Sequence, residues 1–424
     1  MAARTRMQQL LSSLRESIID KPPYISGTLR LPESHFSLFY KVAKDSHAAI
    51  HINLANATSE EAGKMDSESF SPMLDLSFTN LMKIIRGYLL EGTESKADIK
   101  TELYKLNVYG EGSFFKPHVD TPRSENMFGS LVIVFPTPHE GGALLLRHRG
   151  QEWTFDSGRE LAAKGEPSIG YVAFFSDIEH EVAPVISGHR VTLTYNLYFD
   201  DGGPVSANDA VSWHLTPPQL VNEGAFYEAF TAQLENPEFL AEGGTLASGL
   251  RHVYPIQGNL KHVYNVLKGS DVVVYRTVRA LGFEPTLYVY YEWNPPPLGV
   301  LIDKVIDFDG VVMEDEYDDL VDHALRQGGI LVYSPGLEVK GYASESRFKS
   351  PELLEWVTPM TTFNSREDAY PSYGNQPELT WVYGYVWLIV RIGKAGDRLA
   401  YRTVAELNRE IKKRLDERYS YAVL

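Results

Sequence analysis

The sequence predicts an α+β protein: a jelly-roll or barrel of short strands, with helices before it and a second α+β domain after it. Three observations lead to this prediction. Residues 101–199 contain short runs rich in β-branched and aromatic residues, separated by glycine, proline and charged turns. Apolar residues recur at helical spacing before this stretch, and helical and β-rich segments are mixed after it. With 424 residues, 43% of them hydrophobic, the chain is long enough for two or three domains.

Two helices are predicted ahead of the strands. Leucines recur at helical spacing among polar residues over 5–20, and a similar spacing recurs over 74–91. The strand-like runs that follow succeed one another at the short intervals typical of an all-β barrel or jelly roll. In chain order these runs are ELYKLNVYG, SLVIVFP, GGALLLRH, GYVAFFS and RVTLTYNLYF.

A linker is predicted at 200–209, because glycine, proline, asparagine and aspartate gather there. We therefore expect one domain over 1–200, with the N-terminal helices, and a second over 205–424. The second region mixes helical spacing with β-rich runs, which predicts an α+β domain of unknown role; a degenerate second jelly roll is the alternative. Its helices are expected at 223–236, 318–327 and 402–418.

The composition excludes several classes of protein. Without cysteine the chain has no disulfides, thiolate metal sites or cysteine nucleophiles. A net charge of −16 and the lack of a dense Lys/Arg cluster argue against a nucleic-acid partner. No apolar run approaches the roughly 18 residues that a membrane span needs, and the first residues lack the apolar core of a signal peptide. We expect a cytoplasmic or nuclear protein that is not secreted; the oligomeric state is not predicted.

A possible metal site begins with the sequence KPHVDTP, which contains His118 and Asp120. Side chains two apart on a strand share a face, so both can reach one point inside a barrel. His180, in FFSDIEHEV, offers the third ligand that a stable site needs. Two histidines and one carboxylate form the facial triad of non-haem Fe(II) oxygenases, although the same ligands also suit Mn, Co, Ni and Zn. Three ligands on one face leave room for a chelating co-substrate and O₂.

Arg190 follows His180 by ten residues, after the turn signal SGH. The chain would reverse there and bring this arginine alongside the metal strand. A buried guanidinium needs an anion, and the far carboxylate of a metal-chelated dicarboxylate would bind it through two hydrogen bonds. Thr192 and Thr194 share its strand face and could add hydroxyl contacts to the co-substrate.

Together these motifs resemble a known family. The H-x-D triplet, GGALL, SDIEHEV and Arg190 in this order are similar to the prolyl 4-hydroxylase-like 2-oxoglutarate- and Fe(II)-dependent dioxygenases. The resemblance covers about residues 100–200, and more loosely the whole chain looks like fungal proteins that carry such a domain.

The resemblance implies a double-stranded β-helix and a set of roles. His118, Asp120 and His180 would bind iron. Arg190 would hold the distal carboxylate of 2-oxoglutarate, and Tyr109 matches a family tyrosine that hydrogen-bonds this co-substrate. The family also implies O₂ as the oxidant and ascorbate as the reductant that maintains the iron.

Leu144, after the Gly141–Gly142 pair, matches an apolar residue that packs against the co-substrate. The chain departs from the family in one place. Many members have an aromatic-Leu-Asn run before the diglycine strand, whereas this sequence reads VFPTP. A phenolic contact from that strand is therefore not expected.

Other polar residues receive structural roles. Asn107 shares the strand face of Tyr109, where we expect a structural hydrogen bond. Arg251 and His252 lie near glycines without a carboxylate at ligand spacing, so a second metal site is not expected there. Turn or surface roles are expected for His139, His148 and His189.

The sequence therefore predicts a dioxygenase that hydroxylates an unactivated C–H bond and releases succinate and CO₂. The resemblance points to a prolyl or other amino-acid residue of a protein or peptide as substrate, and a small molecule is the other possibility. The alternative function is a non-catalytic, metal-binding interaction protein built on the same jelly roll. Replacing His180 with alanine separates the two, because only an enzyme would lose its function.

Overall fold

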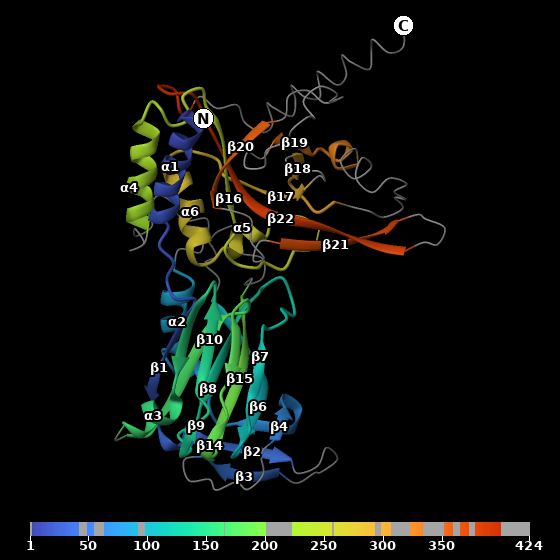
Figure 1. The fold of residues 1–424 in the computed structure, drawn as a ribbon. Helices are drawn as coiled ribbons and strands as arrows, with labels where there is room; N and C mark the ends of the chain where they lie inside the picture. The colour runs from blue at the N-terminus through green and yellow to red at the C-terminus, as the bar shows by residue number, and fades with distance from the viewer. Residues whose placement is uncertain are drawn as a thin grey trace, which may run out of the picture.

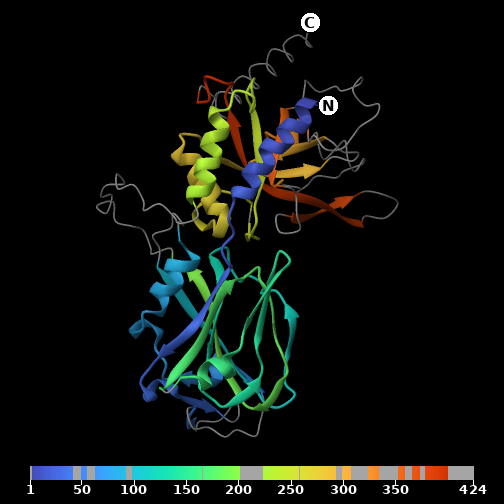
Figure 2. The same ribbon diagram turned by 60° about the vertical axis from the view of Figure 1, so that its left-hand side comes forward.

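The computed structural model of this chain describes residues 2–41, 49–54, 63–91, 98–164, 166–200, 223–256, 258–292, 298–306, 323–333, 352–358, 365–372 and 378–399. Figures 1 and 2 show these residues in two parts stacked end to end, a β-rich part below and a mixed part above. The β-rich part comes from residues up to 200, except that α1 (Ala2–Ser17) lies in the upper part. There α1 packs against the upper part's α4 (Glu223–Glu235) and β20 (Glu352–Thr358).

The β-rich part is a jelly roll of two facing sheets, which confirms the predicted fold class. The larger sheet has the order β1-β12-β8-β15-β6-β4, and its strands pair antiparallel. Every residue of β8 and β12 is buried, as expected of central strands covered on both faces. The strands are β1 (Tyr24–Arg30), β4 (Gly63–Asp66), β6 (Ile99–Tyr109), β8 (Met127–Val134), β12 (Ser168–Phe175) and β15 (Arg190–Phe199).

The smaller sheet closes the other side of the jelly roll and has the order β11-β10-β13-β7. A short pair, β14 and β9, lies at one end. These strands are β7 (Phe115–His118), β9 (His139–Gly141), β10 (Leu144–His148), β11 (Gln151–Phe155), β13 (Glu179–Val182) and β14 (Val185–Gly188). The five predicted runs thus contribute strands to both sheets.

Helix α2 (Leu81–Leu89) covers the outer face of the larger sheet and contacts β1 and β12. Its buried residues, Leu81, Ile85 and Leu89, recur every fourth position, which is the pattern of one helix face. The helix is shorter than the 74–91 expected. The reason is local: the Asp75 carboxylate accepts a hydrogen bond from the Ser77 amide, and a separate 3₁₀ turn forms before the helix.

Several elements of this part were not predicted. A small antiparallel sheet lies at the bottom of Figure 1, and a short helix follows β11. Their short, mixed sequences carry weak periodicity. They are η1 (Glu33–Phe36), β2 (Ser37–Lys41), β3 (Ala49–Asn53), η2 (Ser67–Ser69), β5 (Phe70–Pro72), η3 (Leu76–Phe78) and α3 (Ser157–Ala162). Strands β1, β4, β9, β11 and β14 were not predicted either.

The upper part is α+β, as predicted. Its sheet has the order β16-β20-β19-β18-β17-β22-β21, and β16 also pairs with β22, so the sheet closes on itself. Two of its pairings, β16–β20 and β19–β20, are parallel, whereas strands of a jelly roll pair antiparallel. The remaining elements are β16 (Gly244–Gly249), α5 (Val263–Val266), α6 (Gly269–Ala280), β17 (Thr286–Glu292), β18 (Leu298–Ile302), β19 (Ile330–Tyr333), β21 (Ser365–Ser372) and β22 (Glu378–Ile392).

The expected helix over 223–236 is α4, and residues 323–326 of the expected helix over 318–327 are helical. The rest of that helix, the linker after Asp200 and the helix expected at 402–418 lie outside the described residues. No helix in the described part of the chain is long and apolar enough to cross a membrane.

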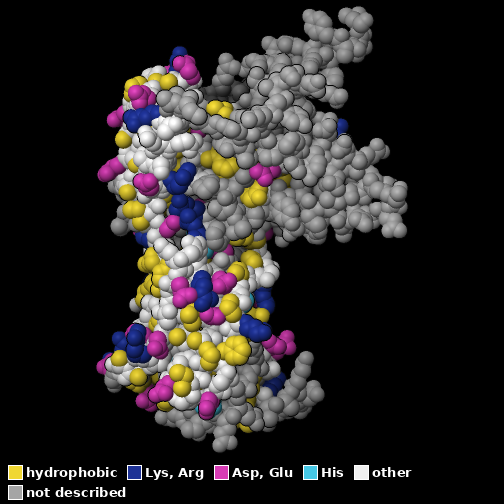
Figure 3. Space-filling view, in the orientation of Figure 1, with side chains coloured by type: hydrophobic (Ala, Val, Ile, Leu, Met, Phe, Trp, Pro, Cys, Tyr) yellow, Lys and Arg dark blue, Asp and Glu magenta, His cyan; other side chains and the backbone are white. Residues whose placement is uncertain are grey.

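Charged side chains of both signs are interspersed on the face shown in Figure 3. Among the described residues, the Arg147 guanidinium pairs with Glu152, Glu179 and Glu181. Neither sign of charge dominates the described surface that this view shows.

Candidate metal and co-substrate site

His118 and His180 meet across two neighbouring strands. His118 ends β7 and is the register partner of His180 in β13, and their ring centroids lie 4.1 Å apart. Asp120 follows two residues later, in the loop, because β7 ends at His118. Its Oδ1 atom lies 3.9 Å from Nε2 of His180. The ligand atoms of all three side chains lie within 4.8 Å of one another, so together they could hold a metal ion.

Both histidines are oriented by the backbone. Nδ1 of His180 lies 3.0 Å from the carbonyl oxygen of Ile178, and Nδ1 of His118 lies 2.9 Å from that of Lys116. Because a carbonyl oxygen only accepts, each Nδ1 carries the proton and each Nε2 keeps its lone pair for a metal. Burial lowers the pKa of His180, and Asp120 opposes this shift. The lowered pKa favours the neutral imidazole.

Asp120 is held by a residue that the sequence prediction missed. The hydroxyl of Ser130 on β8 donates to Oδ2 of Asp120 at 2.5 Å, and Ser130 itself is buried. With Oδ2 engaged, Oδ1 faces His180. The available signal was a single serine in an otherwise apolar run, SLVIVFP, but its partner could not be read from the sequence.

Arg190 is buried in the same interior, and no acidic side chain among the described residues forms an ion pair with it. It begins β15 opposite Tyr109 of β6, and it is only 1% exposed. Within the described structure its Nε and Nη2 atoms have no hydrogen-bond acceptor. Burial lowers its pKa to about 10, with Tyr109 opposing, so it stays charged at neutral pH. An unpaired buried cation is strongly unfavourable and therefore indicates a site for an anion.

A short row of polar side chains continues from Arg190 along the two strands. The Asn107 amide donates to the hydroxyls of Thr192 and Thr194 over 3.5 and 3.4 Å, which are long and weak hydrogen bonds. Asn107 thus makes the structural hydrogen bonds expected of it. Thr192 is buried, and Thr194 is half-buried.

All these groups surround one cavity of about 500 Å³, within the range typical of small-molecule sites. Apolar side chains from both sheets complete the wall beside the three ligands. The lining includes every site residue predicted from the sequence: Tyr109, His118, Asp120, Leu144, His180, Arg190, Thr192 and Thr194.

The lining residues that were not predicted include one tyrosine and two cationic side chains. Tyr104 lies beneath two cations: the Arg123 guanidinium is 4.2 Å from its ring centroid, and the Lys105 ammonium is 4.6 Å away. Tyr104 and Lys105 lie on β6, and Arg123 lies in the loop after β7. The alternation of side chains along a strand does not tell a residue that lines a cavity from one on the surface.

The three nearby histidines differ from one another. His139 is half-buried, with Nδ1 2.7 Å from the Thr137 carbonyl oxygen. His189 lies in the turn before β15, as expected. The expected turn or surface role of His148 was wrong. It is only 9% exposed at the end of β10, where its ring stacks on that of His252 at 5.2 Å.

His252 has no carboxylate at ligand spacing in the sequence, but the fold brings one to it. Asp177, from the jelly roll, places Oδ2 2.9 Å from Nδ1 of His252, in the upper part. With His148 these residues form a second group whose ligand atoms lie within 4.8 Å of one another. Asp177 and His252 are 75 positions apart in the sequence, so no local spacing could have predicted their contact.

One comparison with known protein families matches the stretch of chain that holds the first site. A family model described as the 2OG-Fe(II) oxygenase superfamily matches residues 104–198. A search of curated proteins finds no match to this chain.

Among solved structures, a prolyl-4-hydroxylase from Pseudomonas putida is 22% identical, over 28% of this chain and 62% of its own, with a TM-score of 0.20. This chain thus spans less than two thirds of that enzyme. An oxidoreductase of the 2OG-Fe(II) oxygenase family from Burkholderia pseudomallei is 14% identical over 45% and 90% of the two chains, with a TM-score of 0.24. A viral collagen prolyl hydroxylase from Paramecium Bursaria Chlorella virus-1 is 13% identical over 32% and 79%, with a TM-score of 0.23.

Proposed function

We propose that this chain, which contains a 2OG-Fe(II) oxygenase domain over residues 104–198, hydroxylates an unactivated C–H bond with 2-oxoglutarate and O₂ as co-substrates. Succinate and CO₂ are the other products. The observation that carries the proposal is the pairing, in one cavity, of a His-Asp-His ligand set with the unneutralised guanidinium of Arg190.

His118, Asp120 and His180 would hold Fe(II). Two neutral imidazoles and one carboxylate are the donor set of non-haem iron oxygenases, and they leave coordination positions open. When bound, the metal together with 2-oxoglutarate and O₂ supplies the oxidising chemistry. The protein's part is to orient the ligands through the Ile178 and Lys116 carbonyls.

Arg190 would bind the distal carboxylate of 2-oxoglutarate. Its two unpaired nitrogen groups can donate side by side to one carboxylate. Tyr109, whose ring centroid lies 5.5 Å from the guanidinium carbon, lines the same end of the cavity. Thr192 and Thr194 offer hydroxyls to the co-substrate, and Leu144 provides an apolar wall that keeps water out.

The substrate that we propose is a prolyl or other amino-acid residue of a protein or peptide. A cavity of about 500 Å³ can take a side chain beside the co-substrate, and Tyr104 with its two cations offers a surface for the flanking chain. A small molecule that carries the same group would fit the same space. The net charge of −16 disfavours nucleic acid as the substrate.

The test measures 2-oxoglutarate binding and turnover in Arg190→Leu. We expect binding to the Fe(II)-loaded protein, followed without oxygen by calorimetry, to weaken about 10- to 100-fold, because a charge-assisted hydrogen bond contributes roughly 1.5–3 kcal/mol. Arg190→Lys should lie in between, since it keeps the charge without the paired donors.

Arg30→Leu is the matched control, because Arg30 forms an exposed ion pair with Glu166 and does not line the cavity. Succinate formation with ascorbate present should stop in His180→Ala. Unchanged co-substrate affinity in Arg190→Leu would refute the proposed binding mode. Wild-type protein that binds 2-oxoglutarate but forms no succinate with any peptide or extract would favour the non-catalytic alternative.

A further inference from the structure

The turn between β12 and β13 connects the candidate iron site with the upper part of the molecule. Asp177 lies in this turn and is only 7% exposed. Its Oδ1 accepts from the Lys268 ammonium at 3.1 Å, and its Oδ2 accepts from Nδ1 of His252 at 2.9 Å and from the Val253 amide at 3.1 Å. We call these four residues the Asp177 clasp. Lys268, His252 and Val253 all belong to the upper part.

The next residues of the same turn hold the iron ligand. Ile178 directly follows Asp177, is fully buried, and its carbonyl accepts from Nδ1 of His180 at 3.0 Å. The ring of Phe174 packs against the His180 ring with centroids 4.6 Å apart. One short segment therefore carries the clasp and orients His180.

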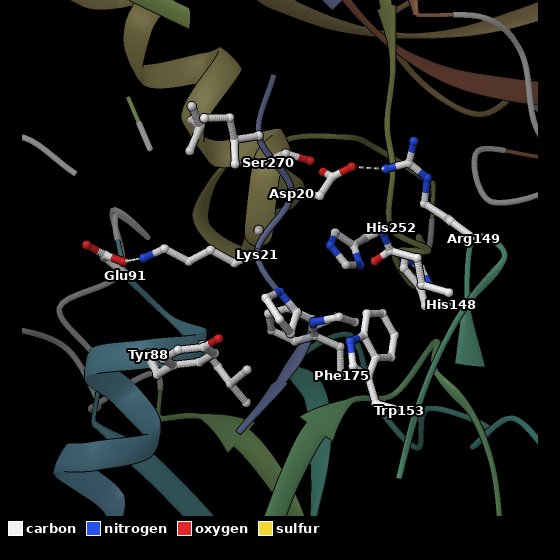
Figure 4. A pocket seen from close by; sticks show the side chains of 17 residues that line it. Asp20, Lys21, Tyr88, Glu91, His148, Arg149, Trp153, Phe175, His252 and Ser270 are labelled. Atoms are coloured by element: carbon white, nitrogen blue, oxygen red, sulfur yellow. Dashed lines mark hydrogen bonds and ion pairs between the residues drawn. The ribbon is translucent and has the colours of Figure 1, made fainter. Parts of the chain in front are cut away.

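Neighbouring side chains of this segment face opposite ways. Phe174 lines the large cavity with His180. Phe175 instead faces the junction between the two parts, where its ring lies 5.0 Å from the His252 ring and 5.0 Å from the Lys268 ammonium. Figure 4 shows this side, where Phe175 and His252 line a separate cavity of about 190 Å³.

The clasp is an ion pair and not a second metal site. Both carboxylate oxygens of Asp177 already accept hydrogen bonds, and a divalent ion between Asp177, His148 and His252 would lie beside the buried Lys268 ammonium. Burial alone would raise the pKa of Asp177, but Lys268 and His252 outweigh it and lower the pKa, so the carboxylate is ionised.

Such a pair is better suited to fixing geometry than to adding stability. The loss of hydration on burying two charges offsets much of their attraction, whereas removing one partner leaves a buried charge without compensation. Three donors of the upper part hold the Asp177 carboxylate. The carbonyl that orients the His180 ring belongs to the next residue, Ile178.

We propose that the upper part positions the iron ligand His180 through the Asp177 clasp, with Lys268 and His252 as positioning residues. The inference rests on the proposed function for the identity of the metal, and it is tested without turnover. It gives the upper part a role in the candidate iron site, although the upper part supplies none of the three proposed iron ligands.

The test is a titration with Co(II), whose visible absorption reports on its ligands. Wild-type protein should bind one Co(II), and His180→Ala should lose the signal. Lys268→Met should weaken Co(II) binding about tenfold or more, the range seen when a group that orients a metal-binding histidine is removed. Asp20→Asn is the matched control, because Asp20 pairs with Arg149 and Arg251 at the same junction without touching the turn.

Thermal unfolding separates positioning from stability. A Lys268→Met protein that melts earlier but binds Co(II) like the wild type would overturn the inference and leave the clasp a structural contact. If Lys268→Met does not fold, the double variant Asp177→Leu/Lys268→Met removes both charges and leaves no buried charge unpaired; it should fold and still bind Co(II) weakly, and wild-type affinity there would also overturn the inference. If the variants change Co(II) binding as expected but the Fe(II)-loaded wild type forms no succinate, the proposed function is refuted and the role of the clasp stands.

Discussion

At the scale of single residues, the site depends on groups that hold the ligands as much as on the ligands. Ser130 occupies one oxygen of Asp120 and leaves the other directed at His180. We expect Ser130→Ala to weaken Co(II) or Fe(II) binding about tenfold, because a ligating carboxylate that lacks its hydrogen-bond donor can rotate. A metal titration on the purified variant measures this.

Ser168→Ala is the control for this prediction. Ser168 is also a buried serine on the larger sheet, but its hydroxyl donates to the Glu166 carbonyl oxygen at 3.1 Å, away from the cavity. It should bind metal like the wild type. Equal affinity in both variants would show that the metal alone orients Asp120.

At the scale of elements, the turn between β9 and β10 sets the space available to Arg190. Gly142 there has φ of +65°, and a Cβ atom would lie 2.9 Å from Cδ of Arg190. Gly150, in the turn between β10 and β11, has φ of +79° but no atom within 4 Å of such a Cβ. The two glycines share a positive φ and differ in the atoms that an added Cβ would contact.

This pair permits a clean comparison. Gly150→Ala should lose about 1–2 kcal/mol of unfolding free energy, the usual cost of placing an L-residue at positive φ. Gly142→Ala should lose more, because its methyl would also lie 2.9 Å from Cδ of Arg190 and 3.0 Å from Cγ2 of Val185. Only Gly142→Ala should also weaken 2-oxoglutarate binding, because the added methyl displaces the Arg190 side chain. Denaturant unfolding and calorimetry give the two quantities. Equal co-substrate affinity in both variants would show that Arg190 can adjust freely.

At the scale of the whole molecule, the junction makes stability depend on pH. The pKa of His148 is lowered to about 4, mainly by burial and also by the nearby His252, Arg149 and Lys268, against the opposing effect of Asp177. An unfolded chain has an ordinary histidine pKa of about 6.5. Between these values the unfolded state binds a proton that the folded state does not, so stability falls as pH falls through this window.

The expected loss from His148 is about 3 kcal/mol between pH 6.5 and 4, since each pKa unit corresponds to 1.36 kcal/mol. His148→Phe keeps a buried ring and should flatten this part of the curve, which denaturant unfolding at several pH values would measure. Asp177, whose pKa is lowered, loses its contribution only at more acidic pH. An unchanged slope in His148→Phe would contradict the prediction.

Much of the jelly roll could be predicted because its signals are local. Strands such as β8 and β12 are continuous apolar runs, and His118, Asp120, His180 and Arg190 stand in recognisable motifs around them. The same motifs selected the side chains that line the large cavity. The ends of helices were harder to predict, because hydrogen bonds such as that from the Ser77 amide to the Asp75 side chain compete with regular structure. The short strands before residue 75 were also harder to predict, because their periodicity is weak.

The amino-acid sequence by itself determined which residue types are available for the chemistry, and on which strands they lie, because strand periodicity and motif spacing act over a few residues. Only the tertiary structure decided that Ser130 reaches Asp120, that α1 packs against α4 and β20, and that Lys268 and His252 close on Asp177. These contacts join residues from 10 to 91 positions apart, or whole elements. Their partners are chosen by how sheets and domains pack, and no local pattern in the chain encodes that choice.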